Sequence, residues 1–324
     1  MSKKHKQNKK TVLPLVSVCT PTFNRRPFIP FMIKCFEHQT YPKDKIEWII
    51  VDDGTDPIGD LVSDIPQVKY FYSEEKMLLG KKRNYMHTKC SGDIIIYMDD
   101  DDYYPPERIS HAVEVLMNNP KFLIAGSSEM HIFYESRNSV FQCGPYAPYH
   151  ATAATFAFRK ELLKQTKYDE EKAFAEESKF TKSYTIPLIQ LNTLKTILVC
   201  SHAHNSLNKE KLLENPAQTK ITPSPYKVDD FIKDPVLKQF YTHDMNSVIE
   251  HYVPGRREFK PKLMEQLQKT EEERAKRGTT FNIFQHPEIV KMRDDYENKL
   301  ADKNKIISEL LKRVKELTNK ESKI

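Results

Sequence analysis

Glycine is scarce in this sequence: 8 of the 324 residues are glycine, and the first strand-like run is followed by a glycine-free segment at positions 21–26, Pro-Thr-Phe-Asn-Arg-Arg. A glycine-rich phosphate-binding loop is therefore excluded at that point. Long apolar runs are also lacking. No stretch approaches the ~18 apolar residues of a transmembrane helix, and no apolar signal region follows the basic N-terminus. We therefore expect no membrane span.

Cysteine is present but forms no recognisable pattern. The five cysteines are an odd number, are widely spaced and include no CxxC pair: Cys19, Cys35, Cys90, Cys143 and Cys200. Neither a zinc site nor a disulfide framework is indicated. Reduced thiols are typical of a cytosol-like compartment, so we expect a cytoplasmic location.

The charge excess is small. The formal net charge is +6, from 51 Lys and Arg against 45 Asp and Glu. This excess does not indicate a nucleic-acid-binding protein and fits an anionic small molecule equally well. The first ten residues carry five lysines and no acid. We expect residues 1–12 to form a solvated, disordered arm.

Short apolar runs alternate with amphipathic stretches in the first half of the chain. Strand-like runs occur at 15–20, 46–51, 68–72 and 94–98, and helical spacing of apolar residues occurs at 27–38 and 107–117. This alternation predicts an α/β fold: a doubly wound, mostly parallel sheet with helices on both faces. Ligands bind such sheets beyond the carboxyl ends of the strands, where this sequence places its polar clusters.

Four consecutive aspartates, Asp99 to Asp102, follow the last of these runs. Neighbouring carboxylates repel one another, and a bound cation would offset that repulsion. In extended backbone, Asp99 and Asp101 project to the same side and suit a shared divalent ion together with diphosphate oxygens. An acidic surface loop is the alternative. A second pair, Asp52-Asp53, ends an earlier strand, and the basic segment Gly80 to Asn84 lies between the two clusters.

The ordered motifs resemble those of family-two glycosyltransferases of the GT-A fold. The resemblance rests on Pro21 to Arg25, Val51 to Thr55, Gly80 to Asn84, Ser91 to Asp93 and Met98 to Asp102, where that family carries P-x-[YF]-N, VDDGS, RN, GD and LDxDD. The match covers about residues 15–118 in order and continues more loosely to about residue 206. It implies transfer of a sugar from a nucleotide-diphosphate donor, for which a UDP-sugar is expected.

The resemblance also implies roles for individual residues. Asp99 and Asp101 match the DxD pair that holds Mn²⁺ or Mg²⁺, with Asp101 the direct ligand, and Asp102 matches the acid near the transferred sugar. The residues expected to contact the nucleotide donor are Pro21, Thr22, Asn24, Asp53, Lys82, Arg83, Asn84, Asp99 and Asp100. In the family a C-terminal H-x-x-N-like segment often contacts metal or phosphate, and His202 with Asn205 fits that spacing. A structural role for His202 is the alternative.

An inverting transfer needs a general base on the acceptor side. The family supplies it from an acidic pair, which Glu176-Glu177 matches, with Glu177 preferred. Glu stands here where the family usually has Asp, and a charged helix face is the alternative reading. Asp102 is the next candidate.

The C-terminal part carries a heptad pattern. Leu300, Ile307 and Val314 are seven residues apart, and Leu310, Leu317 and Ile324 form an interleaved set. The spacing predicts a helix over 287–324 that forms a coiled-coil homodimer, with a docked helix or a solvated tail as alternatives. We place the transferase domain at 13–220 and a helical or irregular extension at 221–286.

The acceptor, whether glycan, protein or lipid-linked, cannot be read from these patterns. Two rival functions remain. A non-catalytic, degenerate transferase domain could act as an oligomeric binding or scaffold protein, although the intact acidic clusters disfavour it. A sugar-phosphate nucleotidyltransferase is disfavoured by the missing glycine-rich loop.

Overall fold

The computed structural model describes residues 12–279, 295, 299–300 and 302–314. Internal contacts divide the chain into one compact unit that ends at Met264 and a second that runs from Glu265 onward. The expected N-terminal arm lies outside the described residues except for Val12. The boundaries expected at residues 220 and 286 stay predictions.

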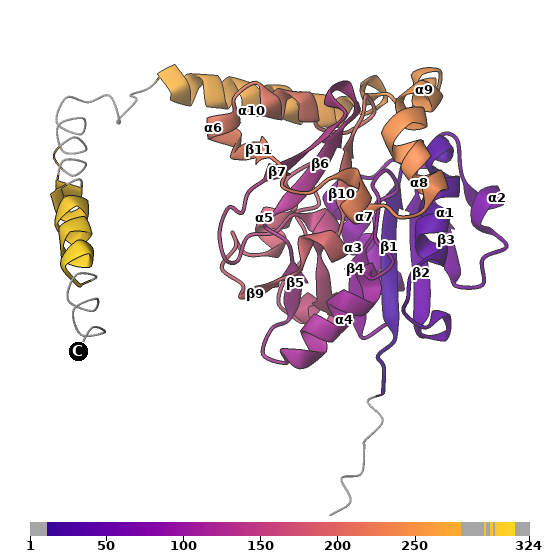
Figure 1. The fold of residues 1–324 in the computed structure, drawn as a ribbon. Coiled ribbons are helices and arrows are strands. Elements are labelled where there is room, and N and C mark those ends of the chain that lie inside the picture. Colours follow the sequence, from indigo (N-terminus) through magenta and orange to yellow (C-terminus); the bar gives the residue numbers. More distant parts are fainter. Residues whose placement is uncertain (1–11, 280–294, 296–298, 301, 315–324) are drawn as a thin grey trace, which may run out of the picture. The chain divides into compact units, whose positions relative to one another are not determined.

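A seven-stranded sheet forms the centre of the first unit, and Figure 1 shows β3 near one edge and β9 near the other. All its strands run parallel except β8, which is antiparallel to both of its neighbours. The strands, in sheet order, are β3 (Val68–Tyr72), β2 (Ile46–Asp52), β1 (Val16–Thr22), β4 (Ile94–Tyr97), β8 (Ala157–Arg159), β5 (Ile124–Gly126) and β9 (Leu188–Gln190). The predicted mostly parallel sheet is confirmed.

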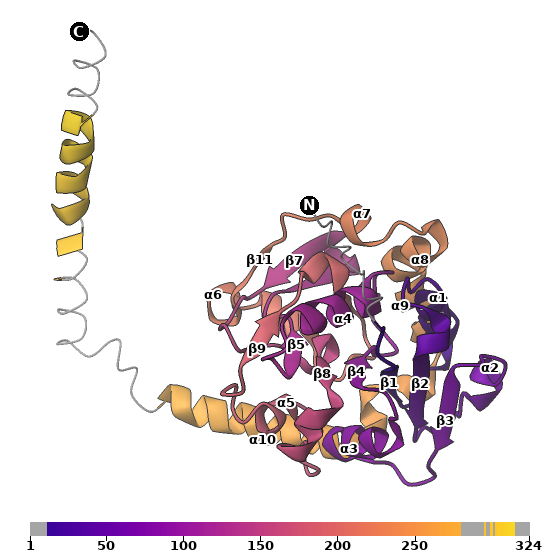
Figure 2. The ribbon, with the colours of Figure 1, turned by 90° about the horizontal axis from the view of Figure 1, so that it is seen from below.

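Helices cover both faces of this sheet, as predicted. Ile50 of β2 belongs to one buried cluster, whereas its neighbours Ile49 and Val51 belong to another. Because successive strand residues point to opposite faces, these two clusters are the cores on the two sides of the sheet. Figure 2 shows α1 and α4 on one side and α3 and α5 on the other. The helices that belong to the seven-stranded sheet are α1 (Ile29–Glu37), α2 (Gly59–Val62), α3 (Leu79–Lys89), α4 (Arg108–Asn118) and α5 (Glu177–Phe180).

A second sheet of four strands was not predicted from the sequence. Its order is β10 (Leu198–Ser201), β6 (Met130–Tyr134), β7 (Ser139–Cys143) and β11 (Ile221–Pro223). β6 and β7 form an antiparallel hairpin, and β10 adds to β6 in parallel. β10 matters for function because it leads directly into His202 and its neighbours.

The short helix α6 (Pro216–Thr219) lies between β10 and β11 in the chain. After β11 come α7 (Val228–Phe231), α8 (Pro235–Gln239), the π-helix η8 (Phe240–Asp244), α9 (Met245–Glu250) and the longer α10 (Pro261–Thr279). Single 3-10 turns are η1 (Arg26–Phe28), η2 (Lys43–Lys45), η3 (Glu135–Arg137), η4 (Ala153–Thr155), η5 (Lys160–Lys164), η6 (Thr193–Lys195), η7 (Lys209–Leu213), η9 (Val253–Gly255) and η10 (Arg257–Phe259).

In the second unit, residues 299–300 and 302–314 are helical. Within this stretch six apolar side chains are each more than half exposed: Leu300, Ile306, Ile307, Leu310, Leu311 and Val314. The rest of the predicted 287–324 helix, including Leu317 and Ile324, lies outside the described residues apart from residue 295. Over the part of the chain that the structure describes, no helix is long and apolar enough to cross a membrane.

Candidate active site

A cavity of about 270 Å³ opens at the carboxyl ends of β1 and β4. Three carboxylates and six basic side chains line it, so its walls carry an excess of positive charge. The lining residues are Pro21, Thr22, Phe23, Arg25, Lys76, Met77, Leu78, Leu79, Lys82, Arg83, Asp99, Asp100, Asp101, Ala173, Ser206, Lys260, Pro261, Lys262 and Leu263. Such a cavity suits a ligand with a concentrated negative charge, such as a diphosphate.

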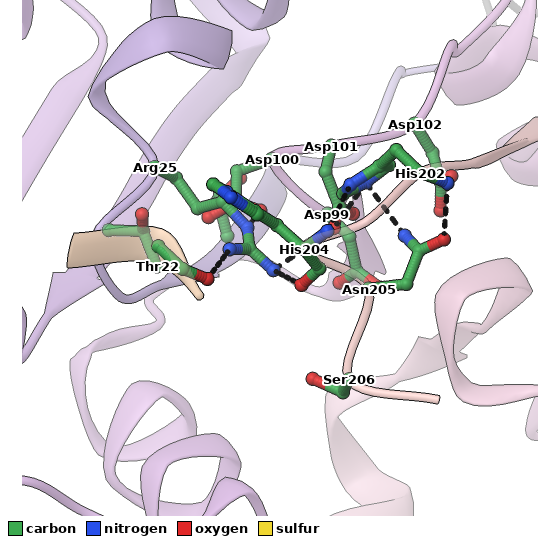
Figure 3. Close-up of polar contacts among 12 residues, drawn as sticks. Thr22, Arg25, Asp99, Asp100, Asp101, Asp102, His202, His204, Asn205 and Ser206 are labelled. Carbon is green, nitrogen blue, oxygen red and sulfur yellow. Dashed lines mark hydrogen bonds and ion pairs between the residues drawn. The ribbon is translucent and has the colours of Figure 1, made fainter. Parts of the chain in front are cut away.

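The four aspartates diverge after β4, and Asp100 and Asp101 share Arg25 as a partner. Asp99 lies 3.8 Å from Arg83, and the Asp100 carboxylate lies 3.5 Å from Arg25. Asp101 Oδ2 lies 3.4 Å from the Arg25 guanidinium and 3.2 Å from His202 Nε2, as Figure 3 shows. The run is therefore no solvated acidic loop, because two arginines balance much of its charge inside the protein.

Asp102 points away from the cavity. Its Oδ1 accepts a hydrogen bond of 2.9 Å from the Cys200 backbone N–H, and its backbone carbonyl accepts one from the Tyr241 hydroxyl. The cavity lining does not include Asp102. The side chain thus joins the acidic loop to β10, and its expected place near the transferred sugar stays a prediction.

Burial and mutual repulsion separate the pKa values of the run. Desolvation, followed by the charge of Asp101, raises the pKa of Asp100 to about 7 and that of Asp102 to about 8. The pKa of Asp101 is held well below its ordinary value, against burial, by His202 and Arg25. Burial lowers the pKa of His202 to about 3. At neutral pH the Asp101 carboxylate that lines the cavity is therefore ionised, and it lies beside the neutral imidazole of His202, which is buried behind the lining.

These two groups fit a divalent cation. An ionised carboxylate oxygen and a neutral imidazole nitrogen are both ligands for Mn²⁺-type ions. Asp99, the third predicted ligand, faces Arg83 instead, and the part of the chain that the structure describes brings no cluster of three His, Cys, Asp or Glu side chains together for a metal. Any further ligands would have to come from a bound diphosphate and water.

Residues expected at the nucleoside form a connected network beside β1. Lys82 Nζ donates hydrogen bonds to the Thr22 carbonyl at 2.7 Å and to Asp53 Oδ1 at 2.5 Å. Asp53 Oδ2 accepts from the Met77 N–H at 2.7 Å. Thr22 Oγ1 is buried without a hydrogen-bond partner among the described residues. Asp53 therefore orients the cavity wall through Lys82 and Met77, although it does not itself line the cavity.

Asn24 follows the end of β1, and its side chain accepts hydrogen bonds from the loop after β2. Its backbone is left-handed, with φ of 52°, and its Oδ1 accepts hydrogen bonds from the N–H groups of Thr55 and Asp56. A Cβ on Gly54 would lie 2.6 Å from this oxygen, which explains the glycine of the Asp-Asp-Gly motif. Asn84, in contrast, bonds to Tyr168 and Glu170 and does not line the cavity.

The two candidate bases lie in different surroundings. Glu176 is buried and accepts a 2.8 Å hydrogen bond from Arg83 Nε, so it forms a buried ion pair. Glu177 has no such cationic partner in contact among the described ion pairs. Burial, followed by the charge of Glu176, raises the pKa of Glu177 to about 7. A general base works best with a pKa near the working pH, which favours Glu177.

Residues 260–263 form part of the cavity wall that no sequence pattern indicated. Arg25 Nη1 donates to the Gly255 carbonyl at 3.3 Å, and Asn24 Nδ2 donates to the Pro254 carbonyl at 2.9 Å. These contacts place Lys260 at the cavity, where it is buried and its Nζ lies 3.3 Å from Ser206 Oγ. No sequence signal marked Lys260, because it lies in a stretch rich in Lys, Glu and Pro without clear periodicity.

Comparison with known sequences finds similarity in the first part of the chain. Residues 17–139, about two fifths of the chain, match the family described as Glycosyl transferase family 2. A Campylobacter jejuni GalNAc(5)-diNAcBac-PP-undecaprenol beta-1,3-glucosyltransferase is 30% identical over 37% of this chain and 38% of the relative. An uncharacterised glycosyltransferase of Rickettsia conorii is 30% identical over 36% of this chain and 20% of the relative.

The matched part of the chain thus covers less than half the length of each of these two relatives. Among solved structures, Staphylococcus aureus TarS 1-349 in complex with UDP-GlcNAc is similar with a TM-score of 0.49 and 18% identity, covering 77% of this chain and 78% of the other. The mannosyltransferase PcManGT of Pyrobaculum calidifontis, in complex with GDP-Man and Mn²⁺, has a TM-score of 0.49 and 17% identity, covering 87% and 84%.

Proposed function

We propose that this protein is an inverting, divalent-metal-dependent glycosyltransferase that moves a sugar from a nucleotide-diphosphate donor, with a UDP-sugar as the first candidate, to an acceptor hydroxyl. The observation that supports this most is the cavity in which Asp101, itself in contact with His202, lies beside six basic side chains. A cation site next to a basic wall is the arrangement that a nucleoside diphosphate requires.

The donor diphosphate would lie between the metal and the basic wall. Asp101 and His202 would hold Mn²⁺ or Mg²⁺, which when bound stabilises the negative charge on the leaving diphosphate. Arg83 Nη1 is buried without a hydrogen-bond partner among the described residues. Burial, followed by the charge of Arg25, lowers the pKa of Lys260 well below its ordinary value, and a bound diphosphate would favour its protonated form. The Arg83 donor and protonated Lys260 would then hydrogen-bond phosphate oxygens and hold the diphosphate as it leaves.

The acceptor hydroxyl would lose its proton to Glu177. As the acceptor oxygen forms its bond to the anomeric carbon, the bond from that carbon to the diphosphate oxygen breaks, and the nucleoside diphosphate leaves. A single displacement of this kind inverts the anomeric carbon. Glu176 would keep its ion pair with Arg83, and, after burial, its charge helps keep the pKa of Glu177 at about 7.

A donor screen tests the proposal. The full chain is mixed with UDP-, GDP- and TDP-sugars in Mn²⁺ or EDTA, and release of the nucleotide into water is measured. We expect release from at least one donor, lost in EDTA. Absence of release from every donor would instead favour the non-catalytic binding or scaffold protein.

A further inference from the structure

A second hollow, of about 500 Å³, lies where the two sheets meet. Its size falls within the range of small-ligand sites. The side chains around it are mostly uncharged, with small polar groups beside apolar ones: Ser127, Ser128, Glu129, Pro145, Tyr146, Ala147, Pro148, Gln190, Leu191 and Thr193. Glu129 is the single ionisable carboxylate of this set, and its Oε1 lies 3.1 Å from His131 Nε2.

The hollow opens at the same edge of the large sheet as the donor cavity. Residues 127–129 follow the carboxyl end of β5, and residues 190–193 end or follow β9. Both strands run in the direction of β4, because β8 is antiparallel to β4 and to β5. In sheet order, β5 and β9 lie two and three strands from β4. The hollow is therefore roughly 10–15 Å from the acidic loop at ~4.8 Å per strand.

A row of aromatic rings connects the hollow with the candidate base. The ring centroids of Tyr146 and His150 are 4.9 Å apart, and those of His150 and Tyr184 are 4.7 Å apart. Tyr146 lines the hollow at one end. At the other end the Tyr184 backbone N–H donates a hydrogen bond to Thr181 Oγ1, and the Thr181 backbone N–H donates one to the Glu177 carbonyl.

The row is held in place by the residues that flank it. Ser128 Oγ accepts hydrogen bonds from the N–H groups of Tyr146 and Ala147, and it also contacts His150 Nδ1. Gln190 Nε2 donates to the carbonyls of Pro148 and His150. These contacts keep the backbone of residues 146–150 in one conformation, so a ligand would meet a surface that is already formed.

Backbone strain at the other end is a separate observation. Residues 182–184 have three successive left-handed conformations, with φ of 51°, 56° and 61°, and none of the three is glycine. Each costs free energy that surrounding contacts must offset, and such residues cluster at functional sites. This turn positions Tyr184 against His150 and near Glu177.

We infer that the hollow and the row Tyr146–His150–Tyr184 bind the acceptor, and that this acceptor is a neutral oligosaccharide. The inference rests on the proposed transferase function. Sugar rings present apolar C–H faces and hydroxyl edges, which match aromatic rings beside Ser, Thr and Gln side chains. A sugar unit bound in the hollow would be separated from the reacting hydroxyl by the length of the row. A single sugar could therefore not occupy both the hollow and the position beside Glu177.

Binding to an array of neutral glycans, without a nucleotide, tests this inference. The full chain should bind glycans of two or more units. Tyr146→Ala should lower binding by roughly tenfold, the equivalent of one aromatic contact. Tyr146→Phe keeps the ring and should retain binding. Ala147→Trp should block the hollow without removing any contact within the fold. Tyr72→Ala is the matched control, because Tyr72 is also exposed and lies on the opposite edge strand.

Nucleotide release into water is measured on the same variants, and it should be unchanged in Tyr146→Ala. Binding to no neutral glycan, or undiminished binding by both Tyr146→Ala and Ala147→Trp, would overturn the inference while leaving the donor chemistry intact. Absence of nucleotide release in the unaltered protein would instead count against the proposed function, and glycan binding would still be judged on its own.

Discussion

Replacing Glu177 by Gln separates the proposed base from its neighbours. The pKa of Glu177 is raised to about 7, so near pH 7 about half of the molecules carry an ionised base. Transfer by the unaltered protein should therefore fall about tenfold per pH unit below pH 7 and level off above it. General-base catalysis contributes 10²- to 10⁴-fold, so Glu177→Gln should raise the barrier by about 3–5 kcal/mol.

The same substitution should stabilise the fold at high pH. The pKa of Glu177 is higher in the folded state than its ordinary value of 4.5, so ionisation costs stability as the pH rises from about 4.5 to 7. Glu177→Gln removes that cost. With allowance for partial exposure, we expect a gain of about 1–3 kcal/mol at pH 8 and almost none at pH 4, where both states are protonated.

Three measurements decide the matter: transfer rate against pH, donor affinity by calorimetry, and urea unfolding at pH 4 and 8. Donor affinity should be nearly unchanged in Glu177→Gln, since a base acts in the chemical step alone. The exposed Glu161→Gln is the matched control and should change none of the three. Near-normal transfer by Glu177→Gln, with the same fall below pH 7, would refute the assignment. Glu176→Gln should instead destabilise the fold by up to roughly 3–5 kcal/mol, because the buried Arg83 loses its closer acidic partner and keeps Asp99 at 3.8 Å.

Three further outcomes follow from the described contacts. Asp101→Asn should abolish the Mn²⁺ dependence of UDP binding measured by calorimetry, and equal UDP affinity in Mn²⁺ and EDTA for the unaltered protein would contradict a metal site. Lys260→Met should weaken UDP binding roughly 10- to 100-fold, whereas substitution of the more exposed Lys262 by Met should weaken it less. The reverse order would show that the buried Lys260 side chain does not bind phosphate. Ile307→Glu with Leu310→Glu should convert a dimer to a monomer in light scattering, and an unaltered protein that is already monomeric would remove the coiled-coil hypothesis.

The sequence predicted the parts of the site that follow buried parallel strands. β1, β2 and β4 are buried on both faces and therefore read as short continuous apolar runs with sharp polar ends. Parallel strands bring those ends to one edge, so Thr22, Asp53 and Asp101 could be placed together before the structure was known. His202 was predicted from a resemblance instead, because His202 and Asn205 fit the spacing of the family's H-x-x-N-like segment.

The rest depended on contacts between distant segments. The prediction that Asp99 and Asp101 share a divalent ion came from the alternation of extended backbone, whereas in the structure Asp99 lies near Arg83 and Asp101 lies near Arg25. Strands of three residues, such as β5 and β9, are too short to show a period in the sequence. Lys260 reaches the cavity because Pro254 and Gly255 bond to the loop after β1, more than 200 residues earlier in the chain.

Arg83 connects the donor and acceptor sides of the site. Its Nε pairs with Glu176 at 2.8 Å, while Nη2 lies 3.8 Å from Asp99, and its guanidinium lies 4.3 Å above the Tyr97 ring. A planar guanidinium can hold these positions together, whereas a lysine ammonium offers a single point charge. Phosphate bound at Arg83 would therefore compete with Glu176 for the same cation. A weaker Arg83–Glu176 pair would leave more negative charge beside Glu177 and raise the pKa of Glu177 further. Binding of the donor would therefore change the protonation equilibrium of the proposed base.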